Sequence, residues 1–194
     1  MILTEKPSWF YKLIEIKNFV EIQEELKQAL YQINPNFDNE IPNYFYHPKD
    51  KLETLVPKYM EYMDSIGVLH RWRGSSIIST NYGMKFPIHI DSENWLEVSY
   101  GLNIPVINCE GTYTVWYDAT VSTTYVDKLG VPKERMTKYI DNTKPIVEIE
   151  RLEMIQPAWI NVSIPHAPVS THNKPRAIFS ARFEPELHDI LYKQ

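Results

Sequence analysis

The chain has 194 residues, enough for one domain, and its 43% hydrophobic and 23% charged residues are ordinary for a globular protein. Its 20 Lys and Arg stand against 25 Asp and Glu, so the whole domain lacks the positive charge that drives duplex binding. Cys109 is the only cysteine, which excludes an intrachain disulfide, and no run approaches the roughly 18 apolar residues of a membrane span. We therefore expect a cytoplasmic protein that binds neither duplex nucleic acid nor a membrane.

The first third of the chain has helical periodicity. Apolar residues recur every three or four positions over residues 19–33, and Asn34-Pro35 ends this run. A second helix is predicted over residues 50–66, with Pro57 either a kink in it or its true start. The residues between the two helices, 36–48, are rich in Asn, Pro and Tyr, and we expect an ordered loop there.

After Gly67 the period changes to two, which is typical of strands. The predicted strands are short and aromatic or β-branched; they cover 68–80, 86–91, 96–107, 112–118, 145–155, 158–164 and 175–183. Seven strands after two helices predict a mainly β domain of the jelly-roll class with the helices packed outside. The whole chain is then one domain, with a helical part at 1–66, a β core at 67–183 and a tail at 184–194.

The polar stretch 119–144 interrupts the strand pattern. It carries many charged residues and shows no clean alternation. A loop of this length in a compact domain is usually a lid, a substrate-binding element or a disordered segment. We expect a surface segment over the open mouth of the barrel, or else a packed structural element.

Two short segments carry candidate metal ligands. In residues 86–91 the period of two places His89 and Asp91 on one face of a strand, although about one such His-x-acid pair is expected by chance. Residues 159–166 end in a histidine and are followed, after a turn, by an arginine-bearing strand. If these two runs form a hairpin, an arginine ten residues after a histidine lies beside it.

Two histidine-arginine pairs have this spacing, His166 with Arg176 and His172 with Arg182. His172 lies in a turn-like stretch, so the firmer strand favours His166. The histidines 89 and 166 with Asp91 form a two-histidine, one-carboxylate set, which suits non-haem Fe(II) and leaves three coordination positions open. The guanidinium of Arg176 could pair with the far carboxylate of an α-keto acid that chelates this iron.

In these residues the chain resembles the 2-oxoglutarate and Fe(II)-dependent oxygenase superfamily, whose fold is a double-stranded β-helix. The resemblance covers residues 67–183 and is most specific in His89-Ile90-Asp91 and in Pro165-His166-Ala167-Pro168-Val169 with Arg176. These segments are similar to those of aspartyl/asparaginyl hydroxylase-like and of phage or bacterial oxygenases. The resemblance implies that His89, Asp91 and His166 are catalytic iron ligands and that Arg176 binds 2-oxoglutarate.

The implied reaction consumes dioxygen and 2-oxoglutarate, hydroxylates a small-molecule or peptide substrate, and releases succinate and CO2. Asn103 is a further candidate for cofactor binding, or a polar strand residue satisfied by the backbone. Arg182 has the strand parity of Arg176 and is expected to face the same cavity, as a ligand contact or as an ion-pair partner. The alternatives are a non-catalytic jelly-roll binding module and a cupin-like metalloenzyme that uses no 2-oxoglutarate.

Overall fold

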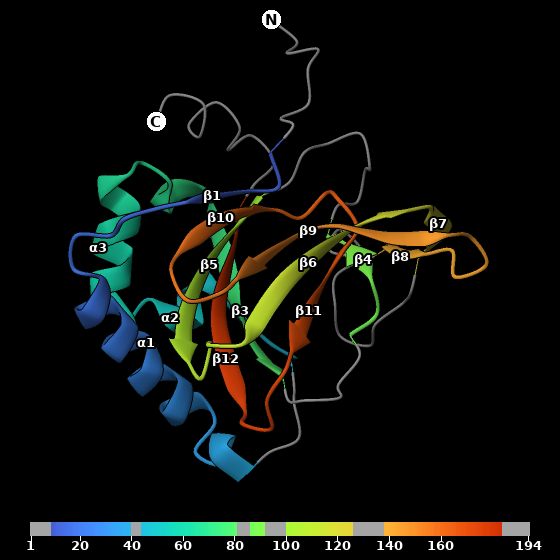
Figure 1. Ribbon diagram of the computed structural model, residues 1–194. Coiled ribbons are helices and arrows are strands. Elements are labelled where there is room, and N and C mark those ends of the chain that lie inside the picture. The colour runs from blue at the N-terminus through green and yellow to red at the C-terminus, as the bar shows by residue number, and fades with distance from the viewer. Residues whose placement is uncertain (1–8, 40–43, 81–85, 92–99, 126–137, 184–194) are drawn as a thin grey trace, which may run out of the picture.

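The computed structural model describes residues 9–39, 44–80, 86–91, 100–125 and 138–183. Two six-stranded antiparallel sheets face each other, with strand orders β1-β10-β5-β12-β3-β2 and β7-β8-β4-β11-β6-β9. Helices cover the outer side of the first sheet (Figure 1). The predicted mainly β, jelly-roll architecture with outer helices is confirmed. Among the residues described, no helix is long and apolar enough to cross a membrane.

The first sheet takes strands from both ends of the chain, and β6 to β9 follow one another in the second sheet. The helices are α1 (Phe19–Ile33), α2 (Lys49–Leu52) and α3 (Pro57–Ser65), with 3-10 turns η1 (Phe37–Asn39) and η2 (Leu69–Arg71). The first sheet contains β1 (Tyr11–Leu13), β2 (Tyr44–Pro48), β3 (Trp72–Thr80), β5 (Tyr100–Ile107), β10 (Ala158–Asn161) and β12 (Arg176–Phe183). The second contains β4 (His89–Ile90), β6 (Thr112–Ala119), β7 (Val121–Tyr125), β8 (Lys138–Ile140), β9 (Ile146–Glu153) and β11 (His166–Ser170).

The N-terminal helices agree with the sequence in part. Helix α1 has the predicted bounds, because one face carries the buried residues that the periodicity predicts, and the backbone N–H of Asn34 closes its last turn. For the predicted second helix, the alternative that Pro57 is the true start is confirmed, since Pro57 begins α3 at a position where its missing N–H costs nothing. The residues before it form the separate short helix α2. The expected loop at 36–48 is wrong in part, because it contains η1 and the edge strand β2, which pairs with β3.

The strand β12 lies near the middle of the first sheet and separates two cores. Its alternate residues Ala177, Phe179, Ala181 and Phe183 pack under the helices in what we call the helix-covered core. Ile178 points the other way, into the inter-sheet core with Trp116 and Ile160. Because strand residues alternate, Arg176, Ser180 and Arg182 share this inner face.

The predicted hairpin of the last two strands is wrong. Strand β11 pairs with β4 and β6 in the second sheet, whereas β12 pairs with β3 and β5 in the first. The five residues between them are sufficient to cross the roughly 10 Å that separates packed sheets. Arg176 therefore does not lie beside His166 on an adjacent strand, because the two strands belong to different sheets (Figure 1).

The polar stretch 119–144 is not the irregular loop expected from its sequence. Its two arms are the strands β7 and β8, which pair with each other, and β8 also pairs with β4. These arms extend the second sheet beside β4 (Figure 1). The stretch 126–137 lies outside the described residues, as does the tail 184–194, so the lid and the tail boundary stay predictions.

Candidate metal centre

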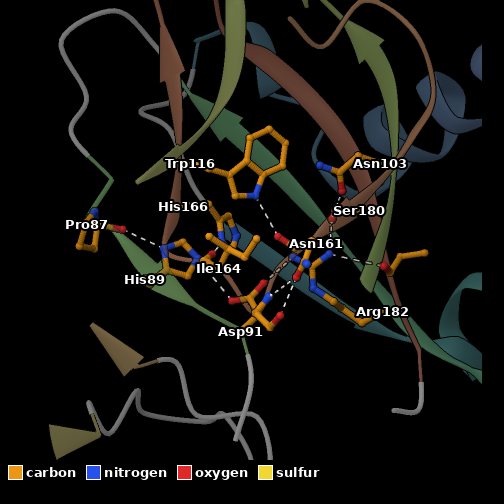
Figure 2. A network of polar contacts seen from close by, with 12 residues as sticks. Pro87, His89, Asp91, Asn103, Trp116, Asn161, Ile164, His166, Ser180 and Arg182 are labelled. Atoms are coloured by element: carbon orange, nitrogen blue, oxygen red, sulfur yellow. Dashed lines mark hydrogen bonds and ion pairs between the residues drawn. The ribbon is translucent and has the colours of Figure 1, made fainter. Parts of the chain in front are cut away.

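Three predicted ligands meet at one end of the second sheet. His89 of β4 is the register partner of His166, the first residue of β11, and their ring centroids are 4.7 Å apart. Asp91 follows β4, and its backbone N–H donates to the carbonyl of Val162 at 2.9 Å. One ligand atom from each of these three residues lies within 4.8 Å of the others (Figure 2). We call His89, Asp91 and His166 the ligand cluster.

Both imidazoles are oriented by backbone carbonyls. The Nδ1 of His89 lies 2.8 Å from the carbonyl oxygen of Pro87, and that of His166 lies 2.9 Å from the carbonyl oxygen of Ile164 (Figure 2). A neutral ring that donates from Nδ1 carries its lone pair on Nε2, the arrangement common among metal-bound histidines. The Nε2 of His89 lies 3.3 Å from Oδ1 of Asp91. Two lone pairs this close favour a cation, or a proton, between them.

The electrostatics of the ligand cluster suit metal binding near neutral pH. Burial, together with the neighbouring His89, lowers the pKa of His166 to about 4, so its ring is neutral. Burial alone would raise the pKa of Asp91, but the charge of Arg182 and a hydrogen bond with His89 hold it well below its usual range. His166 therefore offers an uncharged imidazole and Asp91 an ionised carboxylate, the forms that coordinate metals.

Arg182 is the cation beside the ligand cluster. Its Nη2 lies 2.6 Å from Oδ2 of Asp91, and its Nη1 donates to Oγ of Ser180. The Ser180 hydroxyl donates in turn to Oδ1 of Asn103 (Figure 2). Arg182 therefore forms an ion pair, which is one of the two roles predicted for it. The side chain of Asn103 accepts a hydrogen bond from another side chain and, among the residues described, not from the backbone. Ser180 was missed, although its parity with Arg182 on β12 was visible in the sequence.

Arg176 lies at the opposite end of β12. Four residues of strand, about 13 Å of backbone, separate it from Ser180, which the guanidinium of Arg182 contacts. Arg176 is 1% exposed, and its Nε and Nη1 have no hydrogen-bond partner among the described residues. Burial lowers its pKa to about 10, so the guanidinium stays charged near neutral pH. A buried cation with open donors is costly unless an anion reaches it.

The rival histidine, His172, is not part of the ligand cluster. Its Nε2 lies 3.0 Å from the carbonyl oxygen of Asn108, on the turn that joins β5 to β6. The choice of His166 over His172 therefore agrees with the geometry, while the metal and cofactor roles of all the candidate residues stay predictions.

Comparison with known proteins identifies solved structures with a similar fold, but no family model or curated protein. No family model matches the chain, and no curated protein matches it. A solved structure of a prolyl hydroxylase from Trichoplax adhaerens, in complex with a peptide fragment of the hypoxia inducible factor oxygen degradation domain, is similar with a TM-score of 0.50 and 16% identity. The similarity covers 95% of this chain and 87% of that one. The chain therefore shares its fold with this prolyl hydroxylase.

Two other similar structures come from nogalamycin biosynthesis. The non-heme alpha ketoglutarate dependent carbocyclase SnoK has a TM-score of 0.42 at 10% identity, over 95% of this chain and 85% of that one. The corresponding epimerase, SnoN, has a TM-score of 0.44 at 9% identity, over 93% and 83% of the two chains. The likeness to the prolyl hydroxylase, at 16% identity, concerns the fold alone, and the activity has to be argued from the side chains.

Proposed function

We propose that this protein is an Fe(II)- and 2-oxoglutarate-dependent oxygenase that hydroxylates a small-molecule or peptide substrate. The balanced reaction converts 2-oxoglutarate, dioxygen and a C–H group into succinate, CO2 and a C–OH group. One oxygen atom enters succinate and the other enters the product. Bound iron would supply the activation of dioxygen, and the chain would supply ligands, anchoring and exclusion of water.

One observation carries this proposal, the buried guanidinium of Arg176 with open donors on the same inner face as Arg182. A two-histidine, one-carboxylate set alone would suit several metalloenzymes. A buried cation in the same sandwich interior additionally calls for an anion. A diacid with an α-keto group satisfies both, since its keto acid end chelates the metal and its second carboxylate pairs with a guanidinium.

Each candidate residue then has a separate role. The ligand cluster would hold the metal through two imidazole nitrogens and one carboxylate oxygen, with three positions left open. Arg176 would fix the distal carboxylate of 2-oxoglutarate deep between the sheets. Asn103 is proposed to contact the cosubstrate nearer the metal, from the β5 side of the site. Arg182, predicted to bind the cofactor, is proposed to act through its ion pair with Asp91.

A titration under argon tests the proposal. Addition of Fe(II) and then 2-oxoglutarate to the folded chain should produce a weak visible charge-transfer band, and air should then release succinate. Arg176→Met should bind metal normally but require much more 2-oxoglutarate for the band. Arg151→Met is the matched control, because Arg151 is exposed and its side chain contacts Glu148 and the ring of Tyr113, neither of which belongs to the ligand cluster.

The other outcomes separate the alternatives. Metal binding without any effect of 2-oxoglutarate would favour the cupin-like metalloenzyme. A folded chain without metal affinity would favour the non-catalytic binding module. Succinate release measured across amino acids, peptides and small metabolites would then identify the substrate class.

A further inference from the structure

Gly101 of β5 leaves the space in which the guanidinium of Arg182 lies. The two residues are register partners on neighbouring strands. A Cβ added at Gly101 would lie closer than 3.0 Å to Nη1 of Arg182, 3.3 Å from its Cζ and 3.4 Å from the carbonyl oxygen of Ala181. Any larger residue at position 101 would therefore displace the guanidinium.

The cleared space lets Arg182 reach two groups at once. The guanidinium of Arg182 lies over Gly101, where its Nη2 donates to Oδ2 of Asp91 at 2.6 Å and its Nη1 donates to Oγ of Ser180. The Ser180 hydroxyl in turn donates to Asn103 (Figure 2). Ser180 is fully buried, so this support is shielded from water. A planar guanidinium held at two nitrogens has a fixed orientation.

This contact divides the two oxygens of Asp91 between different partners. Oδ2 accepts from Arg182, whereas Oδ1 lies 3.3 Å from Nε2 of His89, within the ligand cluster. Oδ1 is thus the oxygen that lies beside the other ligands, and the bond to Arg182 turns Oδ2 away from them. A carboxylate that binds through both oxygens would occupy one more coordination position.

We infer that Gly101 and Arg182 are a positioning pair that makes Asp91 a one-oxygen ligand and so keeps a coordination position open. This inference rests on the proposed metal centre. Gly101 acts by leaving space, Arg182 by holding Oδ2, and neither touches the metal. The pair thus controls how many positions remain for the cosubstrate and dioxygen.

Titration of the purified chain with Co(II) alone tests the pair without any turnover. Arg182→Ala should weaken Co(II) binding about 10- to 100-fold and change the visible d–d spectrum, because Asp91 is free to rotate. Gly101→Ala should weaken binding about tenfold and change the spectrum in the same direction, since its Cβ displaces the guanidinium. Arg151→Ala, which removes an exposed arginine, should alter neither quantity.

The double variant separates positioning from a general effect on the fold. If Gly101 acts through Arg182, the Gly101→Ala/Arg182→Ala chain should bind Co(II) as Arg182→Ala does. A further tenfold loss in the double variant, or a wild-type affinity and spectrum in Gly101→Ala, would overturn the inference. Failure of the wild-type chain to bind Co(II) would instead overturn the proposed metal centre itself.

Discussion

The two faces of β12 carry different kinds of side chain, apolar on one and mostly polar on the other. Toward the helices the strand presents Ala177, Phe179, Ala181 and Phe183, all in the helix-covered core. Toward the second sheet it presents Arg176, Ile178, Ser180 and Arg182. Buried apolar side chains need only close packing and the exclusion of water, whereas buried polar groups need specific hydrogen-bond or ion-pair partners. One face should therefore govern stability and the other should govern binding.

The largest expected effect is on the outer face, at Phe179. Its ring packs against Tyr59 with centroids 5.3 Å apart and is 1% exposed. Phe179→Ala should lower the free energy of unfolding by about 3–5 kcal/mol, because it leaves a cavity. Chemical denaturation measures this loss, and Co(II) affinity below the transition should not change. A matching loss of metal affinity would show that the two faces are coupled.

The second effect is on the inner face, at His166. His166→Ala should reduce Co(II) affinity by more than about 100-fold, since it removes one of three ligands. The metal-free chain should lose less stability than Phe179→Ala loses. Isothermal titration and denaturation of the same preparation give both values, and an unchanged affinity would remove His166 from the ligand cluster.

Substitution of Arg176 should raise the stability of the ligand-free protein, in contrast to the substitutions above. Arg176→Met replaces a buried cation with open donors by an apolar chain of similar length, so the ligand-free protein should gain about 1–3 kcal/mol. The variant should lose the increase in melting temperature that 2-oxoglutarate and Co(II) give the parent chain. Thermal unfolding with and without these ligands checks both statements. A destabilised variant would mean that Arg176 already has a compensating partner.

A smaller effect is expected at Ser180. Ser180→Ala removes the link between Arg182 and Asn103 and leaves buried polar atoms without that partner. We expect a loss of about 1–2 kcal/mol in unfolding free energy and a few-fold loss in Co(II) affinity. Ser180→Thr keeps the hydroxyl and serves as the control, and equal behaviour of the two variants would contradict the role of the hydroxyl.

The smallest effect is a pH dependence of the helix-covered side. Burial raises the pKa of Tyr62 to about 12 from its ordinary value of 10.0. Between these pH values the unfolded chain releases the phenolic proton and the folded chain keeps it, so stability is full below pH 10 and falls as the pH rises to 12. Tyr62→Phe should flatten this alkaline slope in urea titrations. An unchanged slope would assign it to another group, such as the buried Tyr59.

The sequence predicted the local features of the fold well. The bounds of α1 follow from a 3.6-residue period, and the shared orientation of His89 and Asp91 follows from a period of two. The strands β7 and β8 could not be found in this way, because they lie in a polar stretch without alternation. Periodicity identifies a strand only where apolar and polar residues alternate, and this stretch shows no such alternation.

The long-range features were less accessible. Strand parity correctly placed Arg176 and Arg182 on one face, but it could not show that β11 and β12 belong to different sheets, because sheet membership depends on distant partners. The predicted neighbour of His166 was therefore Arg176, whereas the cation at the ligand cluster is Arg182. Gly101 carries no sequence signal, since its contribution is the space that it leaves.

Strands β4 and β11 are joined by a single register pair, which makes this the most weakly paired junction described in the second sheet. Strand β4 has two residues, and only His89 and His166 are matched across this join. Among the residues that the structure describes, few backbone hydrogen bonds join the block of β7, β8 and β4 to β11. Such joins open first in native-state hydrogen exchange. Because the ligand cluster includes residues from both sides of this join, a bound metal ion would link β4 to β11 there. Amide protons of β8 should then exchange more slowly when metal is bound.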